Sequence, residues 1–167
     1  MLILSVCQPW AALLVCGVKL WETRSFAPRD QIYSQPLAIH ALPCPYRQLP
    51  PQLLRAIDYA AMQLPADAPD WPGILADLPS GSILGHVQPT YAISTGSAMA
   101  AEVGELQRQL GDWRLDRWAW HCDRPHICRT RIPHPGSRYP APLAPDYALR
   151  VTTAAAAAQP IKDLIQS

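Results

Sequence analysis

The chain has 167 residues, of which 49% are hydrophobic and 16% charged, and its formal net charge is +1 at pH 7. This length and composition suit one domain with a sizeable core, and the near-neutral charge excludes a basic field over the whole protein. No apolar run approaches the ~18–20 residues of a membrane span, and no basic segment precedes residues 13–16 as in a secretory leader. Because the five cysteines are odd in number and lack a framework spacing, we expect reduced thiols and a soluble, cytoplasmic protein.

Charge is unevenly distributed along the sequence. Residues 52–110 contain two basic and six acidic residues, whereas residues 112–139 contain six arginines and three acids. The second segment therefore predicts a local arginine surface.

The first 17 residues predict a strand followed by a short helix. Residues 2–6 are apolar and suit a short strand. Pro9 is tolerated in the first turn of a helix because it has no N–H to lose there. The helix is expected to continue to Cys16, and Gly17 is placed to end it in a left-handed conformation.

A second strand is predicted over residues 20–25. Its period of two places Glu22 and Arg24 on one side. With Lys19 they bring three charges within six residues, close to the indole of Trp10. This pattern suggests a small polar site with aromatic walls, although a salt-bridge cluster on the surface would have the same sequence.

The rest of the chain predicts short strands separated by turns. Strands are expected over residues 36–41, 82–91, 118–122 and 127–132, and helices over residues 50–64 and 98–110. Gly85 suggests a bulge or a close backbone approach, and His40 is expected to be a core histidine. The alanine-rich end should dock as a helix or fray. Such a set of elements favours a small barrel over a sandwich or a doubly wound sheet.

A segment rich in arginine and aromatic residues is the second candidate for binding. Arginine forks suit phosphates, and aromatic faces stack on unpaired bases. The alternative is that the tryptophans are core residues and the arginines a solvated face. The segment comprises Trp113, Arg114, Arg117, Trp118, Trp120, Arg124, Arg129, Arg131, Arg138 and Tyr139, and our candidate ligand contacts in it are Arg117, Trp118 and Arg124.

A zinc site formed by His121, Cys122, His126 and Cys128 is not favoured. Structural zinc normally requires closely spaced cysteine pairs and four converging ligands, whereas His121 and Cys122 would point apart on a strand. We expect no metal and no cofactor.

The N-terminal stretch resembles the signature of the ASCH domain family. The pattern S-x-x-Q-P-W … G-x-K-x-x-E-x-R is formed by Ser5, Gln8, Pro9, Trp10, Gly17, Lys19, Glu22 and Arg24. Residues 81–87 are similar to the family's G-x-I-x-G-x-V strand, and residues 111–120 to its G-D-aromatic … R-aromatic-A-W segment.

The resemblance implies an α+β fold, a PUA-like mixed β-barrel with flanking helices, over residues 1–140. Residues 141–167 would be a C-terminal extension. It also implies binding of RNA or a modified nucleoside in a cleft whose floor is formed by Trp10, Lys19, Glu22 and Arg24.

An enzymatic role stays open from the same resemblance. Some ASCH proteins are acetylcytidine amidohydrolases that use a threonine, a lysine and a glutamate. Lys19 matches that lysine, but Glu22 stands at the place of the threonine, Thr23 would point to the opposite face, and Gln88 stands where a carboxylate is common. The alternatives are a hydrolase or ribonuclease with Lys19 and Glu22 as catalytic residues, or a protein–protein adaptor of phage or mobile-element origin.

Overall fold

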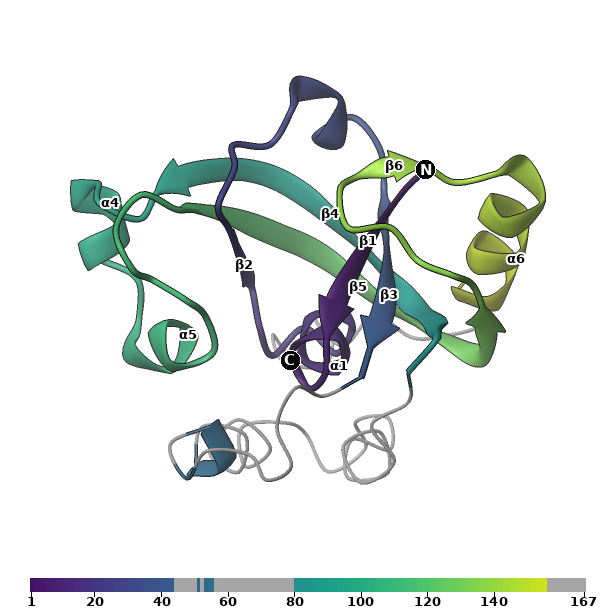
Figure 1. The fold of residues 1–167 in the computed structure, drawn as a ribbon, viewed down its shortest axis with the longest axis horizontal. Helices are drawn as coiled ribbons and strands as arrows, with labels where there is room; N and C mark the ends of the chain where they lie inside the picture. The colour runs from purple at the N-terminus through teal and green to yellow at the C-terminus, as the bar shows by residue number, and fades with distance from the viewer. Residues whose placement is uncertain (44–50, 52, 56–79, 156–167) are drawn as a thin grey trace.

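The computed structural model describes residues 1–43, 51, 53–55 and 80–155 (Figure 1). Its described strands form one mixed sheet, with short helices on both sides. The strands are β1 (Leu2–Cys7), β2 (Trp21–Arg24), β3 (Leu37–Leu42), β4 (Ser82–Ser94), β5 (Trp118–Pro133) and β6 (Ala141–Pro142). The helices are α1 (Trp10–Val15), α4 (Ala98–Ala101), α5 (Glu105–Gln109) and α6 (Pro145–Ala155), with a 3₁₀ turn η1 (Asp30–Ile32). The expected mixture of helices and strands is confirmed.

The sheet has the order β2-β5-β4-β3-β1-β6 and is not closed into a barrel. Strands β1 and β3 are parallel, and the other pairs are antiparallel. The closed barrel expected from the sequence is therefore wrong for the described residues. The reason is that the outer edge of β1 is already occupied: Ile3 pairs with Ala141, and the Ser5 N–H donates to the Ser137 carbonyl at 2.7 Å. The outer edge of β1 is therefore covered from Leu2 to Ser5 by residues 137–142 and not by β2.

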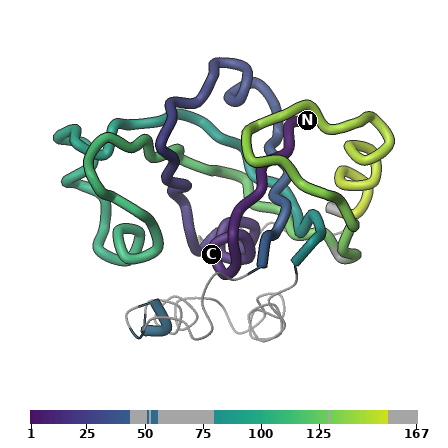
Figure 2. The backbone as a smooth tube through the Cα atoms, viewed as in Figure 1, coloured from purple at the N-terminus to yellow at the C-terminus, as the bar shows by residue number. Residues whose placement is uncertain are grey.

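The main core lies between the sheet and α1. All residues of α1 after Trp10 are buried, and they pack with the interior side chains of β1 and β3 and with Trp120, whose exposure is 0%. A second core cluster lies under α6 and includes Val151, Ile3 and Ile83. Figures 1 and 2 show α6 beside the end of β5 and β6 alongside the start of β1. Within residues 141–155, β6 joins the sheet and α6 packs on it as a helix. In the described part of the chain, no helix combines the length and apolar character needed to cross a membrane.

Two elements differ from the sequence-based expectation. The single helix expected over residues 98–110 is divided into α4 and α5, because Gly104 is extended (ψ 149°) and starts the second helix. The two strands expected over residues 118–122 and 127–132 are one strand, β5, whose path is displaced at Arg124 (φ +46°). Most of the helix expected over residues 50–64 lies outside the described residues.

The glycine predictions are confirmed. Gly17 has φ +75° and ends the segment after α1 in the left-handed region. Gly85 lies at a register shift between β4 and β5, where a Cβ atom would overlap the His126 carbonyl. His40 is 2% exposed, and its Nδ1 atom lies 3.0 Å from the Ser5 hydroxyl, as expected for a core histidine.

Stacked imidazoles on β4 and β5 predict a pH-dependent stability. The rings of His86 and His126 lie 4.5 Å apart, and burial together with His126 lowers the pKa of His86 to about 4. The unfolded chain, with a pKa near 6.5, then binds more protons than the folded chain between these values. Stability should therefore fall as the pH drops from 6.5 towards 4. Urea titrations should show a smaller decline for His86→Gln, and an identical decline would contradict the assignment.

Candidate functional site

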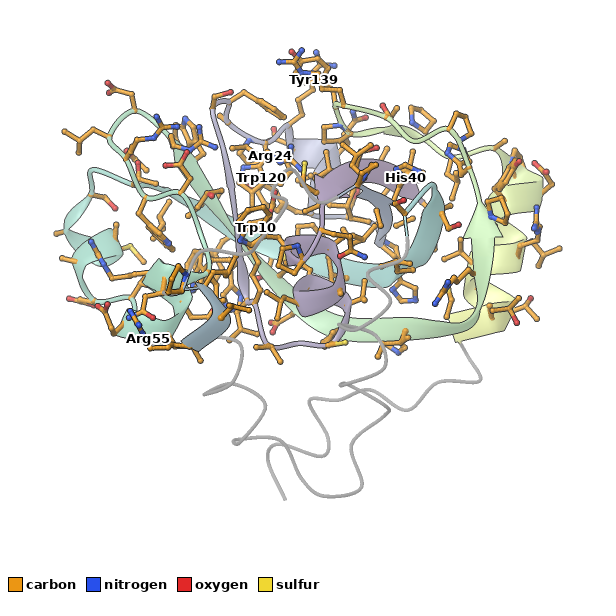
Figure 3. The ribbon with its side chains drawn as sticks, turned by 60° about the horizontal axis from the view of Figure 1, so that its bottom comes forward. Trp10, Arg24, His40, Arg55, Trp120 and Tyr139 are labelled. Atoms are coloured by element: carbon orange, nitrogen blue, oxygen red, sulfur yellow. The ribbon has the colours of Figure 1, made fainter. Side chains whose placement is uncertain are left out.

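A cleft of about 920 Å³ opens between β1, β2 and two loops from the second half of the chain. Its floor comes from the N-terminal stretch, with Trp10, Lys19, Glu22 and Arg24 among the lining residues. One side is formed by residues 109–112 and Arg117, and the opposite side by residues 135–138. Figure 3 shows Trp10 and Arg24 on neighbouring elements near the middle of the molecule. The floor predicted from the sequence is thus assembled in one place.

The centre of the floor is an array of three charges, of which Lys19 and Glu22 are buried and Arg24 is partly buried. Lys19 is 2% exposed, and its Nζ atom donates to the Trp21 carbonyl and lies 3.0 Å from Glu22 Oε2. The other carboxylate oxygen, Oε1, lies 2.9 Å from Arg24 Nε. A buried charge is stable only when it is paired, so each member of this array depends on the others.

The pairing keeps Glu22 ionised. Burial alone would raise the pKa of the Glu22 carboxyl, but the nearby charges of Lys19, Arg24 and Arg117 outweigh it and hold the pKa below its usual range. Because Lys19 donates to a carboxylate and a carbonyl, its protons are engaged in holding the floor together. This arrangement suits electrostatic binding better than proton abstraction.

The backbone on both sides of Lys19 is held by hydrogen bonds to residues of other elements. The turn at Gly17 lets the Val18 and Lys19 amides both donate to the Leu13 carbonyl, each at 3.0 Å. The side-chain amide of Gln107 binds two further backbone groups on either side of Lys19. It donates to the Val18 carbonyl at 2.7 Å and accepts from the Leu20 amide at 2.8 Å. Helix α5 is thereby attached to the strand that carries Glu22.

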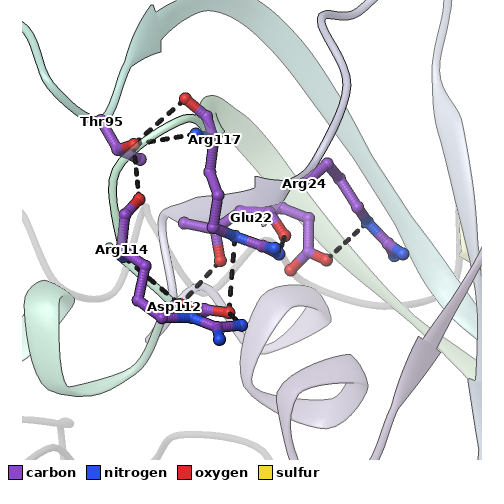
Figure 4. A network of polar contacts seen from close by, with 7 residues as sticks. Glu22, Arg24, Thr95, Asp112, Arg114 and Arg117 are labelled. Atoms are coloured by element: carbon purple, nitrogen blue, oxygen red, sulfur yellow. Dashed lines mark hydrogen bonds and ion pairs between the residues drawn. The ribbon is translucent and has the colours of Figure 1, made fainter.

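One wall of the cleft is a polar network around Asp112 (Figure 4). The Asp112 amide donates to Thr23 Oγ1 at 2.9 Å, and hydrogen bonds from Arg114 hold the pKa of the Asp112 carboxyl below its usual range. Arg117 donates to the Thr23 carbonyl at 3.2 Å and has its Nε atom 3.5 Å from Asp112. Thr95 ties the loop together through the Arg114 and Arg117 carbonyls, at 2.8 and 3.1 Å. Arg117 is therefore held at the cleft by its surroundings.

The opposite wall is formed by residues 135–138 packed on β1. Ser5 Oγ accepts the Ser137 N–H at 2.8 Å and contacts His40. Gly136 (φ +82°) lies so close to Ser5 and His40 that a Cβ atom would overlap both. On the cleft side, Arg24 donates to the Ser5 carbonyl at 2.8 Å, which joins β2 to β1 where the sheet is open.

The structure brings together most, but not all, of the predicted site residues. Trp10, Lys19, Glu22, Arg24 and Arg117 line the cleft, whereas Trp118 and Arg124 lie outside it. Trp118 is 36% exposed on β5, and Arg124 is exposed.

Sequence reasoning did not assign Ser5, Asp112 and Arg138 to the cleft wall, although all three line it. Ser5 belongs to the S-x-x-Q-P-W pattern and Asp112 to the G-D-aromatic segment, so both could have been predicted from the sequence. Arg138 lines the cleft only through the contact of its loop with β1, for which no local pattern exists.

The His and Cys side chains of β5 pack against aromatic rings or lie in the core. Within the described ranges, no group of three or more His, Cys, Asp or Glu side chains is arranged to hold a metal ion. His121 instead stacks on Tyr91 with ring centroids 4.9 Å apart. Burial raises the pKa of Cys122 to about 12 and that of Cys128 to about 11, so both thiols stay protonated.

Comparison with known proteins gives a fold relationship. No protein-family model matches the sequence, and no curated protein does. Among solved structures, the chain is similar to an ASCH protein from Zymomonas mobilis (TM-score 0.53, 12% identity, covering 95% of this chain and 96% of that one). It is equally similar to a variant of that protein with one serine replaced by alanine (TM-score 0.53, 13% identity, covering 91% and 94%).

Proposed function

Because the chain shares the ASCH fold, we propose that its cleft binds single-stranded RNA or a modified nucleoside. The observation that carries the proposal is the charge of the lining. Four basic side chains, Lys19, Arg24, Arg117 and Arg138, face two acidic ones, Glu22 and Asp112. The local surplus of positive charge, in a protein with a net charge of only +1, favours a phosphate-bearing or electron-rich ligand.

The charged and aromatic side chains of the lining are of two kinds: some are buried and paired within the protein, and others are exposed or half-buried. Lys19 and Glu22 are buried and paired, so they set the shape and charge of the floor. Arg138 is exposed and can reach a phosphate. Trp10 is half-buried beside them and offers an aromatic surface for a base. Such a site recognises a ligand without needing a nucleophile.

Salt dependence tests this function. If Arg138 neutralises a phosphate, log affinity for a single-stranded RNA should fall with log salt, and Arg138→Ala should flatten the slope by about 0.7. Arg124→Ala is the matched control, because Arg124 is also an exposed arginine but lies outside the cleft. Fluorescence anisotropy at several salt concentrations measures both. Equal effects of the two variants would contradict the cleft assignment, and absence of binding to any RNA or nucleoside would favour the adaptor alternative.

A hydrolase is the second candidate, and one contact favours it. Ser5 Oγ lies 3.0 Å from His40 Nδ1 in the wall of the cleft, as in a serine hydroxyl paired with a base. However, Ser5 is 4% exposed, its oxygen already accepts the Ser137 amide, and Gly136 covers it. A buried hydroxyl with this environment is better suited to attaching the loop than to attacking a substrate.

We therefore expect no hydrolysis of acetylcytidine by the wild-type protein. Glu22 stands where the resemblance expects a threonine, and Lys19 is engaged with it. Chromatography should show no cytidine and acetate above a no-protein control. Hydrolysis that Lys19→Ala reduces about 10²–10⁴-fold, the usual effect of removing an acid–base group, would instead establish the enzyme.

A further inference from the structure

A second cavity lies next to the cleft and has no role in the function proposed above. Its volume is about 400 Å³, and its lining includes the rings of Phe26 and Tyr139, the apolar side chains of Leu2 and Ile32, and Arg29. Arg29 is exposed, whereas Ile32 is 1% exposed. The cavity therefore has an apolar base, an aromatic side and a cationic rim.

The two cavities share a wall. Arg24 lines the cleft and Phe26, two residues later, lines the second cavity. Likewise, Arg138 lines the cleft and its neighbour Tyr139 lines the second cavity. Two residues of extended chain span no more than about 7 Å, so lining residues of the two cavities are close neighbours along the chain at both places.

The aromatic side of the second cavity is held in position. Phe26 packs edge-on against Trp120, with ring centroids 5.5 Å apart, and Trp120 is fully buried. Tyr139 contacts Phe26 at 5.2 Å yet remains 55% exposed. In the view of Figure 3, Tyr139 lies at the edge of the molecule, with Arg24 between it and Trp10. An exposed tyrosine ring supported by a fixed phenylalanine is a surface on which an unpaired base can stack.

Arg138 connects the two cavities chemically. It lines the cleft, and its guanidinium carbon lies 5.7 Å from the centre of the Tyr139 ring. An exposed guanidinium of this kind can pair with a phosphate that links two nucleotides. The cleft, the arginine and the aromatic cavity thus follow one another along residues 138 and 139.

We propose that the second cavity receives the base adjacent to the one in the cleft, so that the ligand is a single strand of at least two nucleotides and not a free nucleoside. This inference rests on the function proposed above. The cleft alone can hold a nucleoside, but only a strand uses both cavities and the arginine between them.

Calorimetric titration with cytidine 5′-monophosphate and with the trinucleotide CpCpC tests the inference. The wild type should bind CpCpC roughly tenfold or more tightly than the mononucleotide, since each stacked base adds measurably to affinity. Tyr139→Ala should remove most of that gain and weaken mononucleotide binding less, because only the trinucleotide would place a base on that ring. Tyr91→Ala is the matched control, because Tyr91 is 43% exposed and lines neither cavity.

The possible failures are distinguishable. If the wild type binds both ligands with equal affinity, the second base site is excluded while the cleft function stands. If Tyr139→Ala weakens both ligands equally, Tyr139 belongs to the cleft, and the inference is again wrong. If neither ligand binds the wild type, the inference is wrong, and the proposed function fails as well if no other RNA or nucleoside binds.

Discussion

Glu22→Leu should destabilise the protein by about 3–5 kcal/mol, which is the usual cost of removing one partner of a buried ion pair. In this variant the ammonium of Lys19, 2% exposed, would lose its counter-ion. Arg24 would lose the same partner but is less buried. Urea titration at pH 7 measures the change. A loss below about 0.5 kcal/mol, typical of a surface substitution, would show that the array is not buried in solution.

The double variant Lys19→Met/Glu22→Leu is the control for charge. It removes both members of the closest pair, so no lysine is left buried without a counter-ion, and we expect it to recover much of the stability lost in Glu22→Leu. If the double variant is as unstable as the single one, the loss comes from packing and not from the unpaired ammonium.

The loss of folding stability at acid pH should also reflect the ion pairs of Glu22 with Lys19 and Arg24. The pKa of Glu22 lies below its unfolded value of 4.5, so its contribution is fully present above pH 4.5 and is lost as the pH falls through the folded value. Glu22→Leu should lack this part of the acid decline.

Gly136→Ala should have the second large effect. A Cβ atom there would overlap Ser5 Oγ and His40 Nδ1, and φ is +82°. Left-handed backbone strain of about 1–2 kcal/mol adds to an overpacking cost of about 1–3 kcal/mol. Because residues 135–138 also line the cleft, ligand affinity should fall together with thermal stability.

Gly81→Ala separates these two costs. Gly81 also has a positive φ, +70°, but a Cβ atom there meets nothing within 4 Å. This variant should therefore lose only the strain energy, about 1–2 kcal/mol, and keep its ligand affinity. Equal destabilisation by the two substitutions would show that residues 135–138 can move away from β1 without cost.

Local signals were sufficient for the N-terminal part of the site. Pro9 lies directly before α1 and Gly17 two residues after its last residue, and Glu22 and Arg24, two residues apart on β2, both line the cleft. These features depend on backbone preferences and on the two-residue period of a strand, which neighbouring residues determine.

The other walls could not be inferred in this way. The contact between Ser5 and Ser137 joins residues 132 positions apart, and no sequence pattern near either residue predicts it. The open sheet has the same origin, because it depends on which distant segment covers β1. The division of the helix at Gly104 shows the opposite problem: the helix expected over residues 98–110 was continued through a glycine that takes an extended conformation.

The position of β6 beside β1 has a consequence for how the chain folds while it is being synthesised. Strand β1 is made first, yet the residues that cover its outer edge, Ser137 and Ala141, are made more than a hundred residues later. During that interval β1 has an apolar sequence and an unpaired edge, which is the feature that promotes association between nascent chains. We expect truncations that end before residue 137 to aggregate during translation, and chaperones that bind extended apolar segments to hold this strand until synthesis is complete.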